Sequence, residues 1–229
     1  KACWFMSNFQ NPMGASMDDE KKRALAELLA RHQVPMIEDD VYAELYFGQQ
    51  APKPVKAYDQ EGLVMHCSSF SKSLAPGYRV GWVAGGRYAE QIERLKLMTS
   101  LSASIPAQAA IADYLQHGGY DRHLRKLRYA LETQQNAMLA AVARYFPEQT
   151  RVSRPSGGYF LWLELPEAVD SLRLFQLALA QGISLAPGPI FSATRRFAHC
   201  ARLNYGHPWS ARQEKAMETL GRIAQSLAG

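Results

Sequence analysis

The segment at residues 67–81, CSSFSKSLAPGYRVG, holds side chains whose types and spacing could do chemistry. Lys72 lies just after Ser69 and Ser71, and Arg79 follows seven residues later. A lysine amine becomes a nucleophile toward a carbonyl carbon when burial or neighbouring positive charge lowers its pKa. Serine hydroxyls and a guanidinium fork suit a phosphate group. An amine beside a phosphate site indicates pyridoxal phosphate; the alternative interpretation is a solvated lysine in a serine-rich loop.

Three short apolar runs, at residues 2–6, 34–37 and 63–66, are predicted strands. A helix between the first two makes a strand-helix-strand unit, which predicts parallel strands joined by a right-handed crossover. Because the runs are continuously apolar, we expect both faces of the sheet to be covered. The fold class is therefore α/β, with a mostly parallel sheet.

The helix between the first two strands has its own start signals. Ser16, three residues before Asp19, resembles a capping box, and acidic residues near its start match the helix dipole. Leu25, Leu28 and Leu29 are the expected buried stripe.

A polar cluster follows each of the three predicted strands. Asn11 follows the first, Asp39 and Tyr42 follow the second, and Ser69 and Lys72 follow the third. Ligands of open α/β sheets bind in the crevice at the carboxyl ends of the strands. We therefore expect these clusters, which are distant in sequence, to converge on one place.

The rest of the chain alternates between helices and short strands. The expected elements are a strand at 79–85, helices at 88–101, 107–115 and 120–146, strands at 150–154, 158–165, 183–186 and 200–205, and helices at 171–181 and 210–227. We interpret residues 1–125 as a partial, larger cofactor-binding domain. Residues 126–229 are then the long linking helix and a smaller α+β domain.

Composition restricts the class of protein. The 229 residues carry a formal charge of +5, and the basic cluster at 122–128 has helical spacing, which favours a solvated face and a small anionic ligand over nucleic acid. Cys3, Cys67 and Cys200 are far apart, which argues against a disulfide framework or a metal cluster and favours a reducing cytoplasm. No segment reaches the length of a membrane span.

Four motifs taken together resemble the aspartate-aminotransferase-like, fold-type I enzymes that use pyridoxal 5'-phosphate. They are NPxG at 11–14, DxxY at 39–42, SxSK with its arginine at 69–79, and RLN at 202–204. Their order and approximate spacing match this family along nearly the whole chain. The amino-acid sequences of several segments are most similar to the aminotransferase-like domain of GntR/MocR-type transcriptional regulators.

The resemblance implies a role for each cofactor-binding residue. Lys72 would bond covalently to the cofactor aldehyde and later move a proton at the substrate α-carbon. Asp39 would pair with the pyridine nitrogen and keep it protonated. Asp40, by contrast, is interpreted as a solvated acid at the strand end, and a metal site at residues 38–40 is disfavoured because no histidine stands at ligand spacing.

The remaining roles concern oxygen atoms of the cofactor and the substrate. Tyr42 and Asn11 would hydrogen-bond the phenolic oxygen of the cofactor, and Asn11 would also contact the substrate. The phosphate would be bound by Ser69, Ser71 and Arg79.

Arg202 lies in the predicted strand CARLNYG, on the same face as Cys200 and Asn204. A guanidinium inside an apolar strand needs an anionic partner or an exposed edge. By the family's pattern, Arg202 would bind the α-carboxylate of an amino acid or a 2-oxo acid. The exposed edge strand is the alternative.

The resemblance leaves three functions open. The first is transamination between an amino acid and a 2-oxo acid, and the second is sensing of an effector by a regulator with little or no turnover. The third is a decarboxylase, lyase or carbon-sulfur enzyme using the same cofactor. The family's glycine-rich phosphate loop would precede Lys1, so we expect a longer polypeptide. The resemblance also implies a homodimer. It implies DNA contact only through an upstream winged helix.

Overall fold

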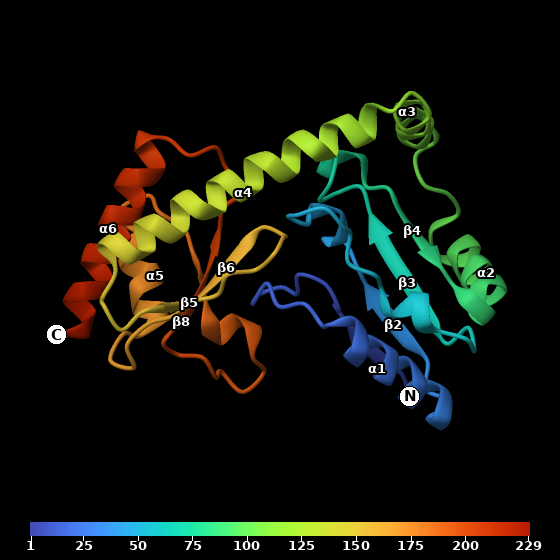
Figure 1. Ribbon diagram of the computed structural model, residues 1–229, viewed down its shortest axis with the longest axis horizontal. Helices are drawn as coiled ribbons and strands as arrows, with labels where there is room; N and C mark the ends of the chain where they lie inside the picture. Colours follow the sequence, from blue (N-terminus) through green and yellow to red (C-terminus); the bar gives the residue numbers. More distant parts are fainter. The chain divides into compact units, whose positions relative to one another are not determined.

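The computed structural model describes all 229 residues and divides into two compact units. Unit 1 comprises Lys1–Gln10 and Ala15–Arg128, and unit 2 comprises Asn11–Gly14 and Tyr129–Gly229. The short insertion of Asn11–Gly14 into unit 2 has no signal in the sequence. Each unit is described by itself (Figure 1).

Unit 1 is built on a four-stranded sheet in the order β1-β2-β3-β4. The strands are β1 (Cys3–Phe5), β2 (Met36–Asp39), β3 (Val64–Ser69) and β4 (Gly81–Ala84). The first three are parallel, as predicted, and β4 is antiparallel to β3. This mostly parallel sheet confirms the α/β fold class.

Helix α1 (Asp19–His32) packs on one face of this sheet and differs from its predicted form in two ways. Its N-cap is Asp18, which accepts from the Lys21 N–H, whereas the Ser16 hydroxyl accepts from the Phe9 N–H outside the helix. The capping-box prediction was therefore wrong by two positions. Leu28 is 48% exposed, because the buried residues follow the spacing of Lys22, Ala26 and Leu29.

The residues of this chain cover the two faces of the sheet unequally. Met36 and Val64 are fully buried in a core with Ala26 and Leu29 of α1. On the opposite face Trp4 is 70% exposed and Ile37 38% exposed. Side chains alternate along a strand, so the apolar run at β2 puts every second residue on a face that neither α1 nor its neighbouring turn reaches.

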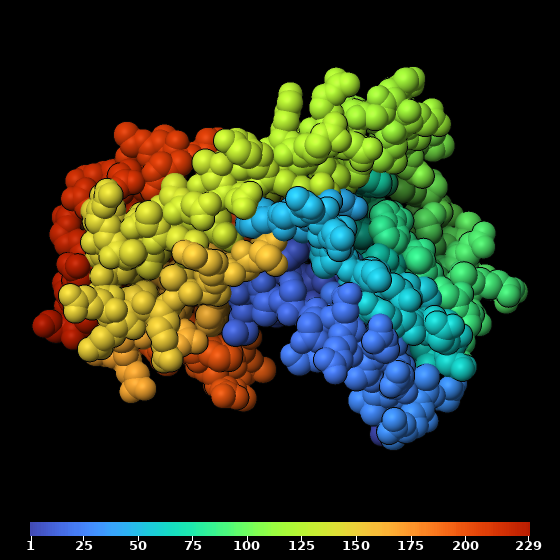
Figure 2. All heavy atoms as spheres, in the orientation of Figure 1, coloured from blue at the N-terminus to red at the C-terminus, as the bar shows by residue number.

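Short 3-10 helices and three α-helices complete unit 1. They are η1 (Ala43–Leu45), η2 (Val55–Tyr58), η3 (Pro76–Tyr78), η4 (Gly86–Tyr88), α2 (Ala89–Ser100), α3 (Ile105–Gln116) and the start of α4 (Gly119–Tyr145). No residue of α2 is buried, and its atoms, green in Figure 2, lie at the surface. No helix of the chain combines the length and apolar character needed to cross a membrane.

Unit 2 combines the remainder of α4 with an antiparallel sheet in the order β5-β6-β8-β7. Its elements are β5 (Arg151–Val152), β6 (Phe160–Glu164), α5 (Ser171–Leu179), β7 (Ala186–Pro187), η5 (Gly188–Phe191), β8 (Cys200–Asn204) and α6 (Ala211–Ala228). The strand expected at 183–186 pairs only from Ala186 onward. The α+β character of this part of the chain is confirmed.

Helix α5 provides a test of how much burial contributes in unit 2. We expect Leu174→Ala to lower the free energy of unfolding by about 2–5 kcal/mol, because this side chain is 1% exposed and its loss leaves a cavity. Leu179→Ala, in the same helix at 53% exposure, should change it by no more than about 0.5 kcal/mol. Denaturant unfolding followed by circular dichroism measures both, and equal losses would contradict the assigned core.

Candidate active site

Lys72 lies in a single tight turn immediately after β3. The Leu74 and Ala75 N–H groups both donate to the Phe70 carbonyl at 2.9 Å, and the Phe70 N–H donates to the Val80 carbonyl. The turn therefore begins and ends on backbone hydrogen bonds while the Lys72 side chain is exposed. This arrangement presents the amine at the carboxyl end of a parallel strand.

The structure brings two of the three predicted phosphate ligands together. Arg79 Nη1 donates to Ser71 Oγ at 3.1 Å. Arg79 ends η3 with a left-handed backbone, φ 54°, and the next strand then returns beside β3, where Gly81 pairs with Ser69. A Cβ on Gly81 would lie 2.8 Å from the Ser68 carbonyl oxygen, so a glycine is required for this close pairing.

Asp39 is the last residue of β2 and lies beside Cys67 of β3. Its Oδ1 atom is buried and has no hydrogen-bond partner. Burial raises the pKa of the Asp39 carboxyl and the nearby Asp40 charge adds to the rise, while the Val41 N–H and the positive charge of Lys72 oppose it. The structure thus places Asp39 within the electrostatic reach of Lys72.

Tyr42 follows Asp39 by three residues, at the start of η1. Its side chain is 4% exposed, so the ring is packed in unit 1. Lys72, Asp39, Tyr42, Ser69, Ser71 and Arg79 all belong to unit 1 and follow from the ends of β2 and β3.

These residues fit the cofactor that the sequence predicts. A buried carboxylate oxygen that lacks a donor is costly unless a ligand supplies one, and a protonated ring nitrogen is such a donor. The hydroxyl and guanidinium of Ser71 and Arg79 have the chemistry that a phosphate dianion requires.

A buried polar network, which sequence reasoning missed, surrounds the carboxyl end of β2. Asp40 was predicted to be solvated, but it is 4% exposed. Asn8 Nδ2 donates to its Oδ1 at 2.9 Å, and His66 Nε2 lies 2.9 Å from its Oδ2. The Ser68 hydroxyl donates to the Asp40 carbonyl at 3.2 Å. The acid is buried because the adjoining strand and loop supply donors on each side.

Glu38 and Lys22 extend this network on the covered face of the sheet. Glu38 is fully buried and accepts from the Ser7 hydroxyl and from the Val55 and Lys56 N–H groups. Lys22 Nζ donates to Asn8 Oδ1 and the carbonyl of Lys53, both at 2.7 Å. Strand alternation with buried Met36 was the sequence signal that could have placed Glu38 inside.

The network predicts unequal effects for two adjacent lysines of α1. Burial lowers the pKa of Lys22, which is 1% exposed, while neighbouring carboxylates partly restore it. We expect Lys22→Ala to cost about 2–3 kcal/mol of unfolding free energy, because the buried Asn8 Oδ1 and the part-buried Lys53 carbonyl lose their charged donor.

Lys21→Ala is the matched control, since the Lys21 side chain is 74% exposed and its ion pair with Asp18 is at the surface. We expect little change for this variant. Denaturant unfolding measures both, and a Lys22 variant as stable as the control would contradict the structural role of the network.

Unit 2 contains the other two predicted residues, and it brings them together. Arg202 Nη1 donates to Asn11 Oδ1 at 2.6 Å. The guanidinium carbon also lies 4.2 Å from the centroid of the Phe160 ring and 5.1 Å from that of Phe191. Strand β8 runs between β6 and β7, so the alternative of an exposed edge arginine was wrong.

The loop that carries Asn11 is tightly packed within unit 2. The Asn11–Pro12 peptide bond is cis, and Gly14 has φ +71°. A Cβ on Gly14 would lie 2.9 Å from Pro155 Cβ, so the NPxG motif needs its glycine for both conformation and space.

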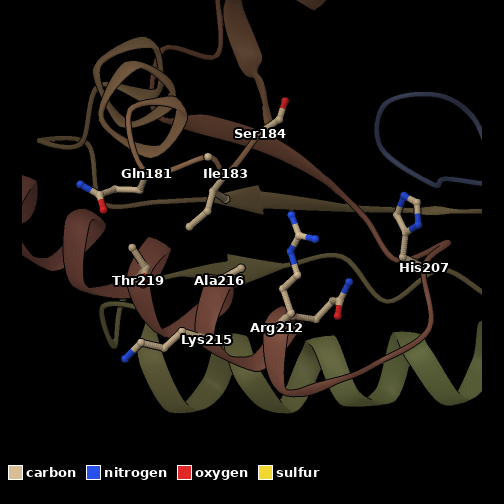
Figure 3. Close-up of a pocket in the computed structure, with 10 residues that line it drawn as sticks. Gln181, Ile183, Ser184, His207, Arg212, Lys215, Ala216 and Thr219 are labelled. Atoms are coloured by element: carbon tan, nitrogen blue, oxygen red, sulfur yellow. The ribbon is translucent and has the colours of Figure 1, made fainter.

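A cleft elsewhere in unit 2 contains none of these residues. It lies between the segment at 181–184 and α6, with Arg212 pointing across the opening toward Ser184 in Figure 3. Its walls come from residues that have no part in the predicted chemistry.

A mostly parallel sheet with a lysine and an aspartate at its strand ends, followed by a long helix and an antiparallel α+β unit, defines the aminotransferase type of fold. The chain belongs to the aminotransferase class I and II family, whose model matches residues 2–220. The resemblance inferred from the motifs is thereby confirmed.

Relatives of the chain include both regulators and enzymes. It is 47% identical to the uncharacterized HTH-type transcriptional regulator YdcR of Escherichia coli, over 98% of the chain and 48% of that protein. It is 32% identical to aromatic-amino-acid aminotransferase 1 of Thermococcus litoralis, over 99% of the chain and 54% of that enzyme. The chain thus spans about half the length of these curated relatives.

Solved structures show the same fold. Kynurenine aminotransferase of Pyrococcus horikoshii, crystallised with PMP, matches 98% of the chain and 56% of that enzyme with a TM-score of 0.91 and 30% identity. The multiple substrate aminotransferase of Thermococcus profundus matches 99% of the chain and 57% of that enzyme with a TM-score of 0.92, also at 30% identity.

Because the Asp39 carboxylate is partly buried, we expect the folded chain to become more stable when this charge is removed. Between the ordinary carboxyl pKa and the raised pKa of Asp39 the folded chain binds more protons than the unfolded chain, so stability falls as pH rises through this range. At neutral pH we expect Asp39→Asn to stabilise the cofactor-free protein by at most about 1 kcal/mol, since water reaches part of the site.

Unfolding of both proteins across the acid and neutral range measures this effect. In the Asp39→Asn variant, the loss of stability that ionisation of Asp39 causes as pH rises should be absent. A variant that is less stable than the wild type at neutral pH would contradict the unpaired carboxylate.

Proposed function

We propose that the chain is the pyridoxal-phosphate-binding domain of a longer protein and that it transfers amino groups between an amino acid and a 2-oxo acid. The observation that carries the proposal is the buried Asp39 Oδ1 atom, which has no donor and lies in a carboxyl influenced by the Lys72 charge. Membership of the aminotransferase class I and II family supports the same reaction class.

Each residue of the proposed site has a distinct task. When bound, the cofactor supplies an electron-accepting ring that stabilises negative charge at the substrate α-carbon. Asp39 would keep the ring nitrogen protonated, and Tyr42 with Asn11 would hydrogen-bond the phenolic oxygen. Lys72 Nζ would hold the cofactor covalently and, once released, take the proton from the substrate α-carbon.

The remaining residues of the proposed site would bind two anionic groups, the phosphate of the cofactor and the carboxylate of the substrate. Ser69, Ser71 and Arg79 would bind the phosphate, and the existing Arg79–Ser71 hydrogen bond supports a shared task for these two side chains. Arg202 would bind the substrate carboxylate, with Asn11 as its neighbour. The aromatic rings beside Arg202 support this role, because they restrict the guanidinium without neutralising it.

A second candidate function is sensing. The 47% identity to the regulator YdcR favours a protein in which this domain binds an effector amine with little or no turnover. In that case we propose that DNA is bound by a winged-helix segment upstream of the domain. For either function we propose a cytoplasmic homodimer.

The experiment uses the full-length protein purified with its bound chromophore. We expect an absorbance band near the edge of the visible range that bleaches on addition of an amino acid and returns on addition of a 2-oxo acid. Repeated turnover with both substrates would establish the enzyme, whereas an amine-dependent spectral change without turnover would favour the sensor. A protein without any cofactor band would exclude both.

Lys72→Ala is the test of the residue assignment. We expect it to abolish the band of lysine-bound cofactor and to reduce amino-group transfer by at least about a hundredfold, since the proton-transfer group is lost. Lys96→Ala, an exposed lysine of α2, is the matched control and should behave as the wild type. Equal activity of the two variants would disprove the role of Lys72.

A further inference from the structure

The first turns of α4 contact the turn that carries Lys72. Tyr120 Oη donates to Ser73 Oγ at 2.8 Å, and His123 Nε2 lies 2.9 Å from the Ser73 carbonyl oxygen. A carbonyl can only accept, so His123 donates through Nε2–H. The Phe70 and Tyr120 rings meet edge to face with centroids 5.8 Å apart. Side chains of one helix therefore contact the turn on both sides of Lys72, at Phe70 and at Ser73.

These contacts are buried enough to restrict the turn. Ser73 is 2% exposed, so neither its hydroxyl nor its carbonyl has water as an easy replacement partner. Burial raises the pKa of the Tyr120 hydroxyl, which therefore remains a donor at neutral pH.

The same helix also holds the turn that follows Tyr42. Arg128 Nε donates to the Glu44 carbonyl at 2.7 Å, and its Nη2 lies 3.1 Å from Glu44 Oε2. The guanidinium carbon lies 3.8 Å from the centroid of the Tyr46 ring. Tyr120, buried Leu124 and Arg128 are four residues apart and so lie along one side of α4.

We propose that Tyr120 and His123 are positioning residues that hold the Lys72 turn through Ser73, and that Arg128 holds the Tyr42 turn from the same helix. The proposal rests on the proposed function for its catalytic consequence only. Lys72 is part of this turn, so the position from which its side chain starts depends on the backbone of residues 70–75. A helix that fixes this backbone fixes the origin of the amine.

The direct test is hydrogen exchange of the cofactor-free, full-length protein. We expect the double variant Tyr120→Phe/His123→Leu to raise amide exchange in residues 70–75 by about tenfold or more, because the closed turn loses two part-buried hydrogen bonds and opens more easily. The matched control is Tyr114→Phe on α3, whose side chain is 38% exposed. Unchanged exchange in the double variant, or an equal rise in the control, would overturn the proposal.

A second readout separates positioning from general stability. With cofactor bound, we expect the double variant to slow the amino-acid half-reaction by about tenfold to a hundredfold, with little change in the amino acid concentration for half-saturation. Replacing His123→Leu by His123→Gln in the double variant should restore much of the amide protection of residues 70–75 and of the half-reaction rate. The glutamine amide can donate to the Ser73 carbonyl, which leucine cannot. Failure of that rescue would make His123 a packing residue only.

The two proposals fail in different ways. If the wild-type protein binds no cofactor, the proposed function fails, while the exchange experiment still decides whether α4 holds the turn. If the wild type transfers amino groups and the double variant matches it in rate and exchange, only the positioning proposal fails.

Discussion

The carboxyl end of β2 is the constraint on which the rest of unit 1 depends. Two adjacent carboxylates have different surroundings there. Asp40 is hydrogen-bonded on both carboxylate oxygens, whereas Asp39 has a buried oxygen without a hydrogen-bond partner. A buried polar group without a hydrogen-bond partner is found only where the surrounding structure keeps it from becoming exposed to water. The hydrogen bonds to Asp40 and Glu38 do this, because they fix the backbone on both sides of Asp39.

The two arginines that we propose bind anions are held in different ways. Arg79 is exposed and bonded to a hydroxyl, so it can exchange partners with a phosphate at little cost. Arg202 is half-buried, lies between aromatic rings and is bonded to a neutral amide oxygen. The amide oxygen and the aromatic rings orient the guanidinium, as the proposed recognition of a carboxylate requires.

The relatives are consistent with one site serving two purposes. Residues that bind a cofactor and a carboxylate are needed equally by an enzyme and by a sensor of amino compounds. The side chains of α4 that contact Ser73 lie next to Lys72 in the turn, a residue that both proposed purposes would use.

The sequence alone determined the α/β fold class, the parallel pairing of the first strands and the family, because apolar runs and short motifs are local patterns that can be found without the fold. It also predicted Lys72, Asp39, Arg79 and Arg202 as site residues, from their types, their spacing and the family resemblance. The tertiary structure decided which polar residues are buried: Asp40 lies inside and Leu28 outside, against expectation. Burial depends on which distant segment supplies a donor or covers a face, as Asn8 and His66 do for Asp40, and no local pattern records that partner.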